Sequence, residues 1–141
     1  MNKTKPASRI FFSFLVLTFI LIWGCEKISN VEPVKIGEPF FLKIGTMYKI
    51  NPALTFTIDS INDYRCPADF MCLWSGDVDS YFNINYNSTK IDTVVSLYTR
   101  NRNPFQIGDY SWHILGVSPL GKSTEVIKQT DYKIEMIINK N

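Results

Sequence analysis

The chain of 141 residues has a single histidine, His113, and contains no Gly-x-Ser-x-Gly sequence. Nucleophilic catalysis needs a base beside the nucleophile. His113 stands between Trp112 and Ile114 in a strand-like run, where a solitary histidine usually packs or forms a hydrogen bond. Paired carboxylates could in principle hydrolyse a glycoside, but a domain of this size shows no obvious cleft. We therefore expect no enzymatic activity and no cofactor.

The sequence also lacks an apolar run at its N-terminus that is long enough to cross a bilayer. The run Ile10–Trp23 has 14 residues, which is about 21 Å as a helix at about 1.5 Å per residue. The hydrocarbon core of a bilayer is about 30 Å thick. Lys3, Lys5 and Arg9 precede the run, and no acidic residue lies in or before it. This pattern is typical of a signal peptide.

The apolar run ends in Leu21-Ile22-Trp23-Gly24-Cys25, which resembles the lipobox of bacterial lipoproteins. Trp23 departs from that pattern, in which small or aliphatic residues are commoner. The resemblance implies that residues 1–24 are a signal peptide, cleaved after Gly24, and that Cys25 carries a diacylglyceryl group and usually a further acyl chain such as palmitate. Two acyl chains are enough for stable membrane anchoring. An uncleaved short anchor and a secreted protein with an incidental cysteine are the alternatives.

A surplus of basic charge is absent from the rest of the chain. Removing residues 1–24 takes away three of the 15 Lys and Arg residues and none of the 13 acidic residues, which leaves a net charge of −1. No basic stretch remains to attract nucleic acid or another polyanion. We therefore expect no nucleic-acid partner.

The mature chain reads as a short polar segment followed by one β-rich domain. Residues 25–37 show no hydrophobic period, and we interpret them as the lipidated N-terminus and a flexible tether. Within 54–61, Phe56 and Ile58 alternate with polar residues, as in a strand with one buried face. Similar short runs separated by turn residues continue to the end of the chain. Residues 38–141 are therefore predicted to form a single antiparallel β-sandwich or partly open barrel of about seven or eight strands.

Apart from Cys25, the chain has two cysteines, Cys66 and Cys72, six positions apart. With His113 they would make a conceivable Cys₂His zinc site, but a structural site needs four ligands and nothing else points to a metal. A thioredoxin-type pair has two residues between its cysteines, whereas five separate these two. An exported protein occupies an oxidising compartment. We therefore predict a disulfide that closes a loop stiffened by Pro67.

The residues around this pair form the pattern Arg-Cys-Pro-x4-Cys-x-Trp-x-Gly, made by Arg65, Cys66, Pro67, Cys72, Trp74 and Gly76. The pattern resembles that of a family of small, uncharacterised, Bacteroidota-like bacterial lipoproteins. Tyr64 and Ser75 depart from the serine and alanine that are usual in that family. The resemblance implies an exported β-domain and brings no known activity.

The stretch 64–76 is interpreted as a structural corner rather than as an active site. Trp74 follows Cys72 by two positions, so we expect it on a strand, packed against the bridge or the neighbouring core. Gly76 would permit a bulge or a close approach of two backbones.

Two polar groups of residues remain as candidates for binding. The loop 99–104 is a candidate binding loop, because loops of β-sandwiches often carry recognition; its candidate residues are Arg100, Asn101, Arg102 and Asn103. The alternative is a solvated connection.

Five aspartates between positions 59 and 79 suggest calcium, which prefers six to eight oxygen ligands, but their spacing matches no EF-hand loop. Asp77 and Asp79 are expected on one strand face as surface residues, paired with Arg65 or a lysine, and no metal site is predicted.

These patterns predict a membrane-anchored envelope lipoprotein whose non-catalytic β-domain binds a protein or a glycan. The main alternative is a structural or envelope-assembly accessory without a discrete ligand, and a calcium-dependent or enzymatic domain is a minor one. Residues 26–29 lack the acidic run that resembles a surface-export signal. We therefore expect the anchor in the outer membrane, facing the periplasm.

Replacing the lipobox cysteine tests the anchor. The Cys25→Ala chain should leave the membrane fraction or remain unprocessed, because no thiol is left to receive the lipid. Fractionation and gel migration of both chains are the measurements. A variant that fractionates and migrates as the wild type does would contradict lipidation.

Overall fold

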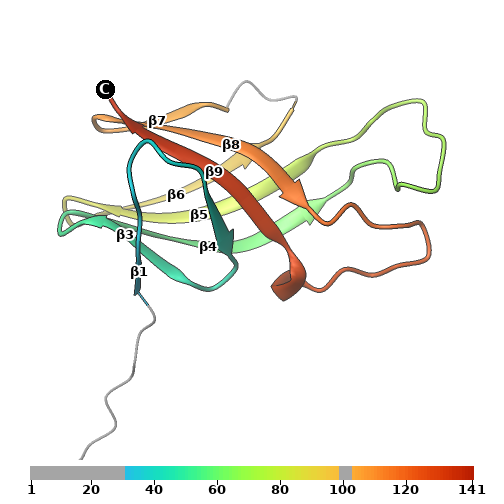
Figure 1. Ribbon diagram of the computed structural model, residues 1–141, viewed down its shortest axis with the longest axis horizontal. Coiled ribbons are helices and arrows are strands. Elements are labelled where there is room, and N and C mark those ends of the chain that lie inside the picture. The colour runs from blue at the N-terminus through green and yellow to red at the C-terminus, as the bar shows by residue number, and fades with distance from the viewer. Residues whose placement is uncertain (1–30, 99–102) are drawn as a thin grey trace, which may run out of the picture.

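The computed structural model describes residues 31–98 and 103–141, which form nine β-strands and one short 3₁₀ helix in two packed sheets (Figure 1). The elements are β1 (Val31–Pro33), β2 (Phe40–Lys43), β3 (Met47–Asn51), β4 (Leu54–Asp63), β5 (Val78–Tyr86), β6 (Thr89–Ser96), β7 (Phe105–Ile107), β8 (Tyr110–Ser118), η1 (Gln129–Asp131) and β9 (Lys133–Lys140). The predicted all-β sandwich is confirmed. The described strands number nine rather than seven or eight, and they form two separate sheets instead of a closed barrel.

The strand order is β1-β3-β4-β5-β6 in one sheet and β2-β9-β8-β7 in the other. All neighbouring strands are antiparallel except β1, which runs parallel to β3 with Val31 opposite Met47. The strand β1 lies inside the segment 25–37 that the sequence predicts to be a free tether, and this prediction is wrong for residues 31–33. All three residues of β1 are exposed, so no apolar alternation marks the strand in the sequence.

The core lies between the two sheets and contains a chain of aromatic rings. Phe56 of β4 stacks on Tyr48 of β3 with ring centroids 5.4 Å apart, and it meets the edge of Trp112 of β8 at 4.6 Å. Phe105 of β7 lies 5.4 Å from Trp112 and 5.7 Å from Phe82 of β5. These contacts cross from one sheet to the other, so the aromatic side chains join the two layers of the sandwich.

Two long loops leave the same end of the sandwich and extend beyond the sheets, on the right of Figure 1. Residues 64–77 connect β4 to β5 and are called the disulfide loop; residues 119–132 connect β8 to β9 and include η1. The side-chain amide of Gln129 bonds both backbone groups of Ile61, accepting from its N–H and donating to its carbonyl, each at 2.8 Å. This amide takes the place of a strand partner for β4 and fixes the second loop against it.

Candidate functional site

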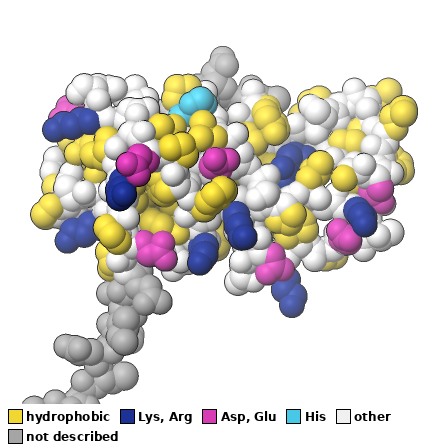
Figure 2. All heavy atoms as spheres, in the orientation of Figure 1, with side chains coloured by type: hydrophobic (Ala, Val, Ile, Leu, Met, Phe, Trp, Pro, Cys, Tyr) yellow, Lys and Arg dark blue, Asp and Glu magenta, His cyan; other side chains and the backbone are white. Residues whose placement is uncertain are grey.

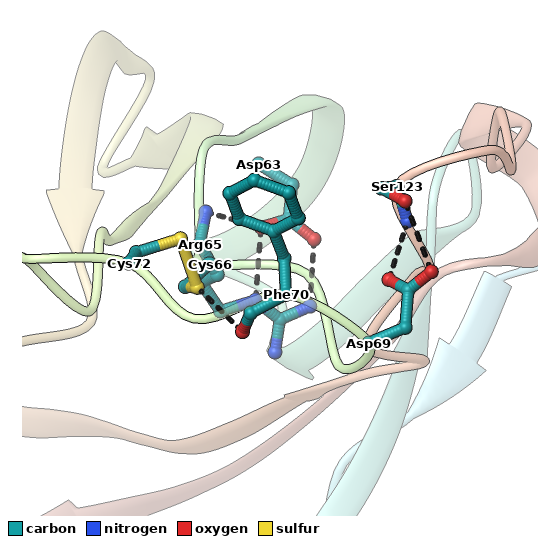
Figure 3. The surroundings of a disulfide bond; sticks show 7 residues. All are labelled: Asp63, Arg65, Cys66, Asp69, Phe70, Cys72 and Ser123. Atoms are coloured by element: carbon teal, nitrogen blue, oxygen red, sulfur yellow. Dashed lines mark hydrogen bonds and ion pairs between the residues drawn. A yellow bond between two sulfur atoms is a disulfide. The ribbon is translucent and has the colours of Figure 1, made fainter.

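The predicted disulfide between Cys66 and Cys72 is confirmed, with the two Cα atoms 5.9 Å apart (Figure 3). It closes a ring of seven residues, which contributes roughly 2 kcal/mol to stability in the chain-entropy model. Inside the ring, the N–H of Phe70 donates to the carbonyl of Pro67 at 3.1 Å. The disulfide loop therefore carries a compact turn at its far end.

The base of the disulfide loop continues the β4–β5 ladder. The N–H of Tyr64 donates to Asp77 O at 3.0 Å, and the N–H of Cys66 donates to Ser75 O at 2.8 Å. Gly76 lies between these bonds with φ of 72°, a region that glycine enters without a steric penalty. A Cβ at this position would overlap the carbonyl oxygen of Tyr64. The narrow base of the loop thus requires glycine on two grounds.

Arg65 joins the disulfide loop to the opposite sheet. Its guanidinium holds both carboxylate oxygens of Asp63, through Nε at 2.8 Å and Nη2 at 2.7 Å. Nη1 donates to Val117 O at 2.6 Å and Nη2 to Pro119 O at 2.8 Å. The side chains of Arg65 and Asp63 are only 8% and 10% exposed. The planar guanidinium therefore links the end of β4 to the end of β8 by bonds that its fixed geometry suits well.

The carboxyl group of Asp63 is ionised in this setting. Burial alone would raise the pKa of Asp63, but the hydrogen bonds and the charge of Arg65 outweigh burial and lower this pKa below its ordinary value. The hydroxyl of Tyr132 also donates to the same carboxylate at 3.2 Å. Burial and the adjacent Asp63 charge raise the pKa of Tyr132, so its hydroxyl keeps the proton it donates.

A second set of contacts joins the tips of the two loops. The N–H of Ala68 donates to Gly121 O at 2.9 Å. Both Ser123 N–H and Ser123 Oγ donate to the carboxylate of Asp69, at 2.7 and 2.9 Å (Figure 3). The backbone hydrogen bond from Ser123 is the main cause that lowers the pKa of Asp69. The two loops therefore form one joined unit.

The prediction that Trp74 lies on a strand and packs against the bridge or the core is wrong. The strand that follows the disulfide loop, β5, begins only at Val78. Trp74 is 57% exposed, and its ring lies against that of Tyr64 with centroids 5.9 Å apart. Trp74 therefore belongs to the surface of the loop.

The joined loops carry large apolar side chains that the fold leaves in solvent. We call this set the apolar tip; its members are Phe70, Met71, Leu73, Trp74, Leu120 and Val126. Phe70, Met71 and Leu73 are 67%, 95% and 111% exposed. Figure 2 shows hydrophobic side chains at this end of the molecule, set among polar, acidic and basic side chains. Exposed patches of this kind mark interaction sites in soluble domains.

A groove of about 300 Å³ lies between the two loops. Its apolar lining comes from Pro67, Leu120, Val126 and Ile127, and its polar lining includes Asp63, Arg65, Lys122, Glu125 and Tyr132. The groove adjoins the apolar tip through Leu120 and Val126. Its volume lies at the lower end of the range of small-molecule pockets, about 300–1,000 Å³.

The candidate binding loop 99–104 falls largely outside the described residues. Arg100, Asn101 and Arg102 are among the residues that the structure does not describe, and so is the predicted lipidation site Cys25. Asn103 is described, and its side chain is engaged within the fold. Its amide donates to Ile114 O at 2.8 Å and accepts from Ile114 N–H at 2.9 Å. These bonds leave Asn103 little capacity for a ligand.

The expectation that Asp77 and Asp79 are surface residues is wrong, because both are buried. Asp77 accepts hydrogen bonds from Val78 N–H at 2.7 Å and Tyr98 N–H at 2.9 Å. Asp79 accepts a bond from the hydroxyl of Ser96. Within 31–98 and 103–141, no group of His, Cys, Asp and Glu side chains is placed to hold a metal ion. Asp77 thus bonds backbone groups, and Asp79 bonds the Ser96 hydroxyl of β6.

The sequence brings in Asp63 and Asp69 only as members of a possible calcium cluster, and it does not single out Ser123 or Tyr132. Asp63 and Arg65 are two positions apart, a spacing that places both side chains on one face of an extended chain. That spacing was a usable signal for the ion pair. The contacts of Ser123 and Tyr132 join positions more than 50 residues apart, and no local pattern reveals them.

Comparison of the chain with known protein families, with characterised proteins and with solved structures finds no significant match. The part of the chain that the structure describes contains no helix with the length and apolar character needed to cross a bilayer.

Gly76→Ala should destabilise the fold by at least about 2 kcal/mol, because alanine is strained at this φ and its Cβ meets the Tyr64 carbonyl. Gly116→Ala is the matched control, since a Cβ at Gly116 meets nothing within 4 Å. Urea unfolding of the three chains is the measurement. An equal decrease in the free energy of unfolding of the two variants would contradict the requirement for glycine at position 76.

The Asp63–Arg65 pair should make stability depend on pH in the acid range. Because the pKa of Asp63 is lowered by folding, its contribution is complete above the ordinary carboxyl pKa of about 3.9 and is lost as pH falls through the folded-state value. Asp63→Asn leaves Arg65 buried without a counter-charge, so it should lower the free energy of unfolding by about 3 kcal/mol at pH 7. The free energy of unfolding of this variant should also depend less on pH in the acid range. Unfolding from pH 7 to pH 2 measures both effects.

The control for this comparison is Asp109→Asn, at an exposed position in the β7–β8 turn. Its stability should follow the wild-type curve at every pH. If the free energy of unfolding of Asp63→Asn falls with pH in parallel with that of the wild type, the ion pair does not cause the loss of stability in acid.

Proposed function

We propose that this chain is a membrane-anchored envelope lipoprotein, held by lipid on Cys25, whose non-catalytic β-domain binds a protein partner through the apolar tip. The observation that carries the proposal is the exposure of large apolar side chains on loops that are themselves tightly held. Phe70, Met71 and Leu73 remain in solvent although the disulfide, Arg65 and Asp69 fix the loops that carry them. Such a surface favours association with an apolar partner.

A protein partner accounts for the tip better than a glycan does. Sugars are recognised through directional hydrogen bonds, and in the apolar tip only Trp74 offers a strong donor, its indole N–H. Aromatic residues and methionine are enriched at protein–protein interfaces. The adjoining groove of about 300 Å³ would accept one apolar side chain of such a partner.

A protein partner also accounts for the tip better than insertion into a bilayer. Asp69 directly precedes Phe70, and its lowered pKa keeps it ionised. Glu125 directly precedes Val126, and its side chain is 54% exposed in an ion pair with Lys122. Charged carboxylates are costly within hydrocarbon, whereas the rim of a protein interface is polar and stays hydrated. The acids beside the apolar residues fit such a rim.

Site-specific photocrosslinking in intact cells tests the proposal. A photoreactive amino acid replaces Leu73 in the full chain, and the matched control carries it at Leu115, which is also exposed but lies on β8. We expect one discrete protein adduct from position 73, none from position 115, and at least a tenfold loss of the adduct when Met71→Asp is added. The aspartate would place a charge at the centre of the apolar contact.

The remaining outcomes separate the alternatives. A diffuse smear of envelope proteins would favour a structural or assembly accessory without a discrete ligand. Adducts to lipid, or equal labelling from positions 73 and 115, would contradict the tip as a protein-binding surface.

A further inference from the structure

The four edge strands of the sandwich differ greatly in length. β1 and β7 have three residues each and β2 has four, whereas β6 has eight (Thr89–Ser96). Short edge strands commonly protect a sheet against aggregation, because an open edge can pair with a strand of another chain. Among the described strands, β6 is the one long edge, and β5 is its strand partner on one side. Val94 has a further interaction, so the part of this edge considered for pairing is Thr89–Thr93.

The direction of the backbone groups along β6 follows from one hydrogen bond at its end. The N–H of Leu97 donates to Val78 O at 3.0 Å, in register with the β5–β6 ladder. Backbone groups of successive residues in an antiparallel strand point alternately to the two sides. Ile91 and Thr93 therefore point toward β5, and Lys90 and Asp92 present their N–H and C=O groups at the outer edge.

We propose that β6 is a dimerisation edge, at which two copies of this chain pair antiparallel about a two-fold axis through Ile91. In this register Ile91 lies opposite Ile91 of the partner subunit. Lys90 lies opposite Asp92 of the partner subunit, and Asp92 lies opposite Lys90 of the partner subunit. The two five-stranded sheets become one continuous sheet, and the interface is isologous, as a two-fold axis requires.

Charge complementarity selects both the occupant and the register. The side chains of Lys90 and Asp92 are 67% and 70% exposed, and their contact within one chain is long, at 4.0 Å. Asp92 Oδ1 accepts a hydrogen bond from Asn83 Nδ2 at 2.7 Å, so Oδ2 is the oxygen that would face Lys90 of the partner subunit. Pairing about Ile91 brings opposite charges together twice, which stabilises a cross-strand pair. Pairing about Lys90 or about Asp92 would place like charges directly opposite each other. The edge is therefore complementary to itself in one of these three registers.

The backbone and the neighbouring side chains suit the same arrangement. Lys90 and Asp92 both direct their backbone groups outward, so each of the two Lys90–Asp92 pairs can exchange two N–H···O bonds. The Ile91 pair is then a non-hydrogen-bonded pair, with Cα atoms about 4.5 Å apart. Ile91 is half-buried against the core, and pairing covers more of its side chain. β1 lies at the opposite edge of the same sheet.

Disulfide crosslinking of the full chain in membranes tests the pairing. Ile91→Cys should give a covalent dimer on mild oxidation, because the expected Cα separation falls within the range that a disulfide spans. Leu115→Cys, at an exposed position on β8, is the matched control and should give a yield of covalent dimer at least tenfold lower. Equal dimer yields from the two chains would overturn the proposal.

Charge exchange tests the register. Lys90→Glu alone and Asp92→Lys alone each place like charges opposite one another twice, so each chain should self-associate about tenfold more weakly than the wild type. A mixture of these two chains restores opposite charges at both positions and should recover wild-type affinity in a heterodimer. Co-purification with two different tags measures this. A mixture that associates no better than either chain alone would overturn pairing about Ile91, and the result does not depend on the apolar tip.

Discussion

The ion pair between Asp63 and Arg65 is the contact on which the geometry of the loops depends. Both side chains are about nine-tenths buried, and charges removed from water are costly unless their hydrogen-bonding groups are satisfied. The guanidinium meets this demand with the Asp63 carboxylate and with the carbonyls of Val117 and Pro119. Val117 lies in β8 of the opposite sheet, and Pro119 directly follows β8. The hydrogen bonds that satisfy the buried guanidinium therefore also set the position of the disulfide loop relative to the β8–β9 loop.

The rigidity of the loops explains why the apolar tip stays exposed. A flexible loop with Phe70, Met71 and Leu73 would be expected to fold these side chains back onto the nearest apolar surface. The seven-residue disulfide ring limits the reach of the chain, and the Asp69–Ser123 contact holds its far side. A rigid loop also loses less conformational freedom when it binds. The same constraints therefore maintain the exposure and reduce the entropic cost of association.

The sequence predicts the sandwich better than it predicts the site, for a physical reason. Strand alternation is local, and Phe56 and Ile58 reveal their buried face within a few residues. Cysteine chemistry and compartment likewise predict the Cys66–Cys72 bridge. The burial of Asp77 and Asp79 depends on Tyr98 and Ser96, which lie about twenty residues away. Trp74 is exposed because β5 begins only at Val78. β1 is held by pairing with β3, and its exposed residues give no apolar pattern in the sequence.

Both proposed contacts are small, and the lipid anchor that we propose would make small contacts sufficient. Standard protein interfaces bury about 1,600 Å², more than a loop tip or a few paired strand residues provide. Attachment to a bilayer confines binding partners to one surface and raises their effective concentration. Contacts that would be too weak in dilute solution can then be occupied. The proposed anchor would in this way let both the rigid tip and the β6 edge form occupied contacts from modest interfaces.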